Sequence, residues 1–209
     1  SPSEIYRMLE RLVVRDYVSR SAEGDRYAVT MKLFVLGSQH PPMRRLVARA
    51  QPLMDAFTER TQQSVHMVMP DRGAAVVVAQ ASGPANWEFR LRIGARLDLT
   101  TTSSGQTLLA FQNAERLQET LAVWGGSDAT DRIAAMEPEL ATIRQKGHRI
   151  GASLQLVGVR DISVPALGPH GDAVAVFTCP YLQRVDGDTA DDTATLAELR
   201  LLAERMSMR

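Results

Sequence analysis

The feature that most constrains this chain is a hydroxyl-rich turn between two apolar segments, within Ile93–Phe111. Thr102, Ser103 and Ser104 are good N-cap residues, because a side-chain oxygen can accept from the free N–H groups of a first helical turn. The apolar residues that follow, among them Leu108, predict a helix with one buried face. The start of such a helix suits a small anion or a polar group of a ligand. The pattern equally fits a helix that is merely well capped, which is the more frequent case.

Composition places the chain among ordinary globular proteins. Its 209 residues are 44% hydrophobic and 23% charged, which is enough to bury a core. The 24 basic and 24 acidic residues cancel, so net charge neither favours nor excludes a nucleic-acid partner. The single cysteine, Cys179, excludes an internal disulfide framework and predicts a reducing, cytoplasmic location. No apolar run approaches the roughly 20 residues of a membrane span, and no signal peptide is visible.

The first thirty residues predict a helix followed by a short β-hairpin. Apolar residues recur at helical spacing over Ser3–Val13, and two short strands follow at Tyr17–Arg20 and Arg26–Val29. A helix and hairpin in this order resemble the second half of a winged helix-turn-helix. In that motif the helix enters the major groove and the hairpin lies on phosphates. A purely structural helix and hairpin is the open alternative.

The rest of the chain predicts an α+β domain. A short helix over Met31–Gln39 should end at His40-Pro41-Pro42, and Pro52 should kink or divide the next helix, Met43–Thr61. Strands are then predicted at Val65–Met69, Ala74–Ala81, Phe89–Ile93, Arg149–Leu154, Val159–Leu167 and Asp172–Cys179, and helices near Glu115–Val123, Glu137–Lys146 and Leu196–Met206, with a loop at 124–128. Strands in hairpins with helices between and after them are typical of an α+β sheet domain.

Four segments, in this order, resemble the IclR family of transcriptional regulators. They are Ser3–Leu9, Asp25–Val29 with Lys32–Gly37, Thr102–Ala110, and Gly147 with Gly158–Pro165. The resemblance implies a partial winged helix-turn-helix over residues 1–30, a linker helix over 31–42 and a GAF-like effector-binding domain over 43–209. It also implies homodimers or homotetramers on palindromic operator DNA, with a small organic acid or aromatic compound as effector. The family's first DNA-binding helices would precede Ser1, so we expect this chain alone to bind DNA poorly.

The resemblance carries over to specific residues. Implied DNA contacts are Ser3, Glu4, Tyr6, Arg7, Arg11, Arg20 and Arg26. Implied effector contacts are Met67, Met69, Leu97, Thr102, Ser103, Ser104, Gly105, Asp161, Ser163 and Thr178. Met67 and Met69 alternate with Val68 and could line one face of a strand, although core packing is the more frequent role of methionine. Gln106 stands where the family usually has lysine, which favours a neutral or aromatic ligand over a strongly anionic one.

Enzyme and metal functions find little support. Ser104-Gly105 lacks the G-x-S-x-G frame of a nucleophile elbow. The four histidines, His40, His66, His148 and His170, have no metal-ligand spacing and are most simply surface or turn residues. Arg160-Asp161 could be a structural ion pair or a cavity edge. We therefore expect no catalytic residue, metal or cofactor.

Three functions remain open in this order. The first is a ligand-responsive DNA-binding transcriptional regulator. The second is a small-molecule sensor module without autonomous DNA binding, and the third is an enzyme acting on a small acid.

Overall fold

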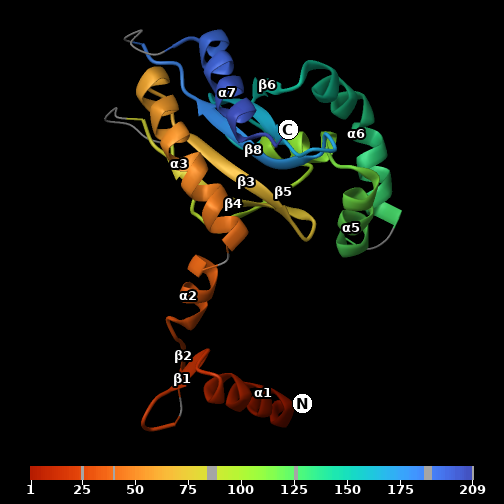
Figure 1. The fold of residues 1–209 in the computed structure, drawn as a ribbon. Helices are drawn as coiled ribbons and strands as arrows, with labels where there is room; N and C mark the ends of the chain where they lie inside the picture. Colours follow the sequence, from red (N-terminus) through yellow and green to blue (C-terminus); the bar gives the residue numbers. More distant parts are fainter. Residues whose placement is uncertain (25, 40, 84–88, 125–126, 186–189, 209) are drawn as a thin grey trace. The chain divides into compact units, whose positions relative to one another are not determined.

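The computed structural model describes residues 1–208 except 25, 40, 84–88, 125–126 and 186–189 (Figure 1). The chain divides into two compact units, Ser1–Leu46 and Val47–Arg209. The sequence predicts the start of the second domain four residues earlier, after residue 42. His40 and parts of the predicted turn at 21–25 and loop at 124–128 lie outside the described residues.

The first unit contains the helix and hairpin that the sequence predicts. Helix α1 (Pro2–Val14) precedes strands β1 (Val18–Arg20) and β2 (Tyr27–Val29), which pair antiparallel, and α2 (Lys32–Gln39) follows. None of the residues of α1 is buried, and the apolar side chains of this unit stay largely in contact with solvent.

Helix α2 ends at Gln39, as the sequence predicts, and helix α3 (Pro41–Thr61) begins two residues before the predicted start at Met43. Proline suits a first helical turn, because the N–H that it lacks has no helical partner there. Pro52 lies inside α3 without dividing it; division was one of the two predicted outcomes, and the other, a kink, stays a prediction.

The second unit is built on a six-stranded antiparallel sheet with the order β5-β4-β3-β8-β7-β6. Its strands are β3 (Val65–Asp71), β4 (Ala74–Ala81), β5 (Arg96–Asp98), β6 (Arg149–Ala152), β7 (Arg160–Leu167) and β8 (Ala173–Tyr181). Its further helices are α4 (Ser103–Ala110), α5 (Ala114–Trp124), α6 (Ser127–Lys146) and α7 (Asp192–Met206). The predicted α+β class is confirmed.

Two helical layers enclose this sheet. Helix α4 packs against β4, β5, β7 and β8 on one face and against α6 behind it. A buried cluster that includes Val68, Val77, Leu108, Ile143 and Val176 joins these elements. Helices α3 and α7 lie on the other face (Figure 1), where α7 contacts β7 and β8. Among the described residues, no helix is both long enough and apolar enough to cross a membrane.

The predicted strand at Phe89–Ile93 is wrong, because no described residue of this segment is in a strand. Pairing with β4 starts only after Gly94, whose φ of +84° turns the chain so that its N–H donates to Val77 O. The strand that forms is β5, three residues further on. Helix α6 is also longer than predicted, because it continues through Pro138 from Ser127.

Candidate functional site

A row of polar residues crosses five strands of the sheet. The pairing register aligns Arg149 of β6 with Ser163 of β7, Thr178 of β8, His66 of β3 and Gln80 of β4. Directly paired residues project from the same face of a sheet. Helix α4 begins on this face, because its residues Ser103 and Ser104 hydrogen-bond to Arg149 and His66.

One part of the row forms a buried chain of hydroxyl groups with a histidine at its end. His66 Nε2 lies 3.2 Å from Ser104 Oγ, which is 2.8 Å from Thr178 Oγ1, and Thr178 Oγ1 is 2.9 Å from Ser163 Oγ. All four side chains are buried. Burial lowers the pKa of His66 from 6.5 to about 4, so the imidazole is neutral at pH 7.

A second part of the site is charged. Ser103 Oγ donates to Asp161 Oδ2 at 2.7 Å and accepts from a terminal nitrogen of Arg149, also at 2.7 Å. Arg149 Nε donates to Gln106 Oε1 at 2.9 Å. The side-chain amide of Gln106 in turn donates to Thr100 O at 2.8 Å. One serine therefore links a carboxylate to a buried guanidinium.

The first turn of α4 is capped as the sequence predicts. Thr102 Oγ1 accepts from Gly105 N at 3.0 Å, and Thr102 O accepts from Gln106 N at 2.9 Å. Within the part of the chain that the structure describes, the N–H groups of Ser103 and Ser104 donate to no protein acceptor. Two hydrogen-bond donors at the positive end of the helix dipole are thus left available.

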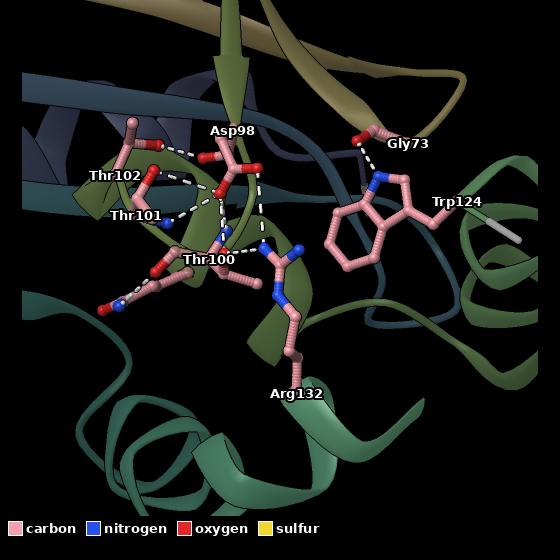
Figure 2. A network of polar contacts seen from close by, with 8 residues as sticks. Gly73, Asp98, Thr100, Thr101, Thr102, Trp124 and Arg132 are labelled. Atoms are coloured by element: carbon pink, nitrogen blue, oxygen red, sulfur yellow. Dashed lines mark hydrogen bonds and ion pairs between the residues drawn. The ribbon is translucent and has the colours of Figure 1, made fainter. Parts of the chain in front are cut away.

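The turn before α4 is fixed by Asp98, as Figure 2 shows. Asp98 Oδ1 accepts four hydrogen bonds, from the N–H and the hydroxyl of Thr100 and from those of Thr101. Burial alone would raise the pKa of Asp98, but these hydrogen bonds together lower it. Arg132 of α6 donates to the Thr100 hydroxyl and lies over the ring of Trp124. The start of α4 is therefore held in place by side chains of the protein itself.

A small cavity of about 40 Å³ opens beside this helix start. It is lined by His66, Phe89, Leu91, Leu97, Thr102, Ser103, Ser104, Ser153, Gln155, Leu156, Asp161, Thr178 and Pro180. The volume would hold about three water molecules or the polar end of a small ligand. A larger hollow of about 450 Å³ lies between the β3–β4 hairpin and α5. Two pairs of its polar side chains bond within the lining, Arg116 with Glu119 and Gln112 with Thr120.

Six of the ten residues predicted to contact an effector line the cavity. They are Leu97, Thr102, Ser103, Ser104, Asp161 and Thr178. Ser163 lies behind Thr178, to which it is hydrogen-bonded. Arg160 points elsewhere and pairs with Asp192 at 3.1 Å, so the two neighbours Arg160 and Asp161 have separate roles. That these residues bind an effector stays a prediction.

Besides Ser163, three of the predicted contacts do not line the cavity. Met67 is fully buried and follows His66 in β3, so it faces the opposite side of the sheet, and Met69 does not line the cavity either. A Cβ on Gly105 would lie 2.4 Å from the Cα of Leu99. This glycine is needed for close packing between two backbone segments, and it does not give a ligand access to the helix.

Two residues of the site were not predicted from the sequence, His66 and Arg149. His66 is 5% exposed, so its interpretation as a surface or turn residue is wrong. Arg149 is 9% exposed and lies two residues after the glycine that ends α6. A polar or charged residue within a short apolar strand was the available signal for both. His170, in contrast, is exposed at a turn as expected.

The predicted DNA contacts lie on the first unit. Ser3 and Glu4 are in the first turn of α1, Tyr6, Arg7 and Arg11 follow on the same helix, and Arg26 directly precedes β2. Arg20 is held on the hairpin, because its Nε donates to Gly24 O at 2.8 Å and its guanidinium lies 5.7 Å from the centre of the Tyr27 ring. DNA binding by these residues stays a prediction. No group of three potential metal ligands is present among the residues that the structure describes.

Solved structures share this architecture of a helix-and-hairpin unit followed by an α+β domain. One is an IclR homologue from Microbacterium hydrocarbonoxydans complexed with 4-hydroxybenzoate, with a TM-score of 0.74, 20% identity, and coverage of 99% of this chain and 85% of that one. Another is the IclR protein of Thermotoga maritima, with a TM-score of 0.66, 23% identity, and coverage of 99% and 84%. The fold is thus that of IclR-type regulators.

Residues 43–208 match the family model described as the bacterial transcriptional regulator IclR C-terminal domain. The chain belongs to this family, and the resemblance seen in the sequence is confirmed. Among curated relatives, the transcriptional regulator KdgR of Dickeya chrysanthemi is 29% identical over 185 residues, which cover 87% of this chain. The match spans only 61% of the length of that relative.

Proposed function

We propose that the full-length protein is a ligand-responsive DNA-binding transcriptional regulator that senses a small organic acid or aromatic metabolite. Family membership supports the general role. The observation that carries the ligand-binding part is the cavity at the start of α4, where the N–H groups of Ser103 and Ser104 are available beside the carboxylate of Asp161. Donors and an acceptor that converge on a small hollow are typical of a ligand site.

The nature of the effector follows from the chemistry of this cavity. Backbone N–H groups at a helix start bind a carboxylate or carbonyl oxygen. Apolar side chains of the same lining, such as Leu91 and Leu97, suit the carbon skeleton or ring of a metabolite. The 4-hydroxybenzoate bound by the Microbacterium homologue combines these two features in one molecule.

DNA recognition is assigned to residues 1–30, with residues 31–42 as a linker and 43–209 as the effector-binding domain. Arg7 and Arg11 are separated by one helical turn on α1, so both can face DNA. Exposed apolar residues on and next to the linker helix, Val29, Met31, Leu33, Val35 and Leu36, would be covered by a second subunit. We infer a homodimer or homotetramer that binds a palindromic operator in the cytoplasm without acting as an enzyme.

In such an assembly, the effector acts by binding one arrangement of the subunits more tightly than another. A dimer places two recognition helices at a fixed spacing, which must match the spacing of the operator half-sites. An effector that stabilises one arrangement therefore changes the affinity for DNA.

The test uses the full-length protein, with the residues 1–209 chain beside it. Selection from a random-sequence DNA library gives the operator, and a thermal-shift screen of small acids and aromatic compounds gives the effector. We expect the effector to change operator affinity of the full-length protein. If the full-length protein binds no DNA sequence specifically, the role as a transcriptional regulator is contradicted. The alternative, a small-molecule sensor module without autonomous DNA binding, would then remain. Catalytic turnover of a screened acid, abolished by a change at Ser103, would contradict the non-enzymatic role.

Ser104→Phe and Ser104→Ala form a matched pair for locating the effector. The phenylalanine would occupy the cavity, whereas the alanine removes only a hydroxyl group. We expect the phenylalanine variant to lose effector binding and retain its assembly and DNA binding. Equal affinity for the effector in both variants would place the site elsewhere.

A further inference from the structure

A buried arginine lies directly behind the wall of the proposed effector cavity. Arg149 is 9% exposed, and its hydrogen bonds go to the neutral side chains of Ser103 and Gln106. The nearest carboxylate that faces it, Glu139, is 3.8 Å away and its side chain is 54% exposed. The positive charge of Arg149 is therefore only partly compensated by a direct partner, although charged groups are rarely buried without one.

The opposite charge is the carboxylate of Asp161, which lies on the other side of Ser103. The hydroxyl of Ser103 donates to Asp161 Oδ2 and accepts from Arg149, so the direction of its hydrogen is fixed by both. The carboxylate of Asp161 lines the cavity, and its second oxygen has no donor among the described residues. By itself, this carboxylate would repel an anion that approached the N–H groups of Ser103 and Ser104.

We propose that Arg149, acting through Ser103, compensates the charge of Asp161 and thereby makes the cavity selective for a hydroxy acid. The carboxylate of the ligand accepts from the N–H groups of Ser103 and Ser104. The hydroxyl group of the ligand donates to the open oxygen of Asp161. Arg149 does not touch the ligand, so it is a positioning and charge-compensating residue. The inference rests on the proposed effector site, and it replaces the preference for a neutral ligand that Gln106 suggested.

The structure also limits the size of the polar group that enters. A cavity of about 40 Å³ accommodates a carboxylate with a neighbouring hydroxyl group, and a larger ligand must extend beyond it. Two pairs of probes follow from this. Lactate and lactamide fill the cavity only, and 2-hydroxybenzoate and 2-hydroxybenzamide carry a ring with the hydroxyl group next to the carboxylate or amide. Within each pair the shape is retained, the negative charge is removed and one acceptor oxygen becomes an NH2 donor.

Calorimetry with the four probes is carried out on the wild type, Arg149→Gln and Arg149→Lys. We expect the wild type to bind at least one acid about tenfold or more tightly than its amide, because hydrogen bonds to charged groups are the stronger ones. Arg149→Gln should abolish this preference for the acid. Arg149→Lys, which keeps the charge, should restore most of it. A wild type that binds neither acid, or prefers the amides, would overturn the inference.

Asp161→Asn in the Arg149→Gln background separates charge compensation from a structural role. Because the double variant lacks the uncompensated carboxylate, it should bind the acid about tenfold more tightly than Arg149→Gln. It should also lose selectivity for the hydroxyl group of the ligand. If Arg149→Gln weakens acid and amide equally and lowers the melting temperature, Arg149 is structural and the inference fails. None of these outcomes depends on operator binding, so the inference can fail while the proposed regulatory function stands.

Discussion

The buried histidine of the site makes the stability of the second unit dependent on pH. In the folded chain, burial lowers the pKa of His66 from 6.5 to about 4, so His66 stays neutral down to mildly acidic pH. The unfolded chain takes up a proton on this residue as the pH falls below about 6.5. The unfolded state then binds more protons than the folded state, so the free energy of unfolding decreases as the pH falls.

The size of the effect follows from the two pKa values. One pKa unit corresponds to about 1.4 kcal/mol, so a fall from 6.5 to about 4 amounts to about 3 kcal/mol once both states are protonated. Most of this loss occurs between these two pH values. Between pH 7.5 and pH 5 we expect His66 to account for about 2 kcal/mol of lost stability.

The assay is urea denaturation at the two pH values for the wild type, His66→Gln and His170→Gln. Glutamine at position 66 can still bond to Ser104 but does not titrate. The loss of stability on acidification should therefore be about 2 kcal/mol smaller in His66→Gln than in the wild type. His170 is exposed at a turn, and its replacement should leave the loss unchanged. Identical pH dependence in all three proteins would refute the buried, neutral state of His66.

Further substitutions test the packing, the hydroxyl network and the first unit. Gly105→Ala should destabilise the fold by about 1–3 kcal/mol or more, measured by urea denaturation, because the added Cβ would meet the backbone of Leu99. Thr178→Val should lower stability by about 1–3 kcal/mol, because two buried hydroxyls lose a partner. Met31→Ser should shift sedimentation towards monomer, and unchanged sedimentation would remove Met31 from the interface. In the full-length protein, Arg7→Ala should weaken operator binding by about 1–3 kcal/mol if Arg7 contacts a base. A loss shared by all DNA sequences would assign Arg7 to phosphate.

The start of α4 could be predicted from the sequence because helix capping is local. Thr102 and the N–H of Gly105 are three residues apart, so the hydrogen bond between them depends on no distant part of the chain. The same is true of the turn before it, where Asp98 bonds to Thr100 and Thr101. The class of fold was equally accessible, since alternation and helical spacing are read in short windows.

The opposite wall of the cavity could not be predicted in this way. Arg149 and Asp161 meet at Ser103 only because β6 and β7 pair in one particular register, and a slip of β6 by one residue would turn Arg149 to the other face, away from Asp161. The missing strand at Phe89–Ile93 has a related cause. Its alternating pattern fits a strand, but pairing with β4 depends on the turn at Gly94, which short-range periodicity does not reveal.

Met67 shows what a single strand can and cannot determine. The alternation of Met67 with its neighbours correctly assigns alternate residues of β3 to opposite faces, but it does not say which face borders the cavity. The face is decided by the partner strand, because His66 pairs with Thr178 and Met67 with the buried Phe177. A polar residue in an apolar strand needs a polar partner when it is buried. His66 and Thr178 are such a pair, so the cavity had to lie on the histidine side of the strand, away from the methionines.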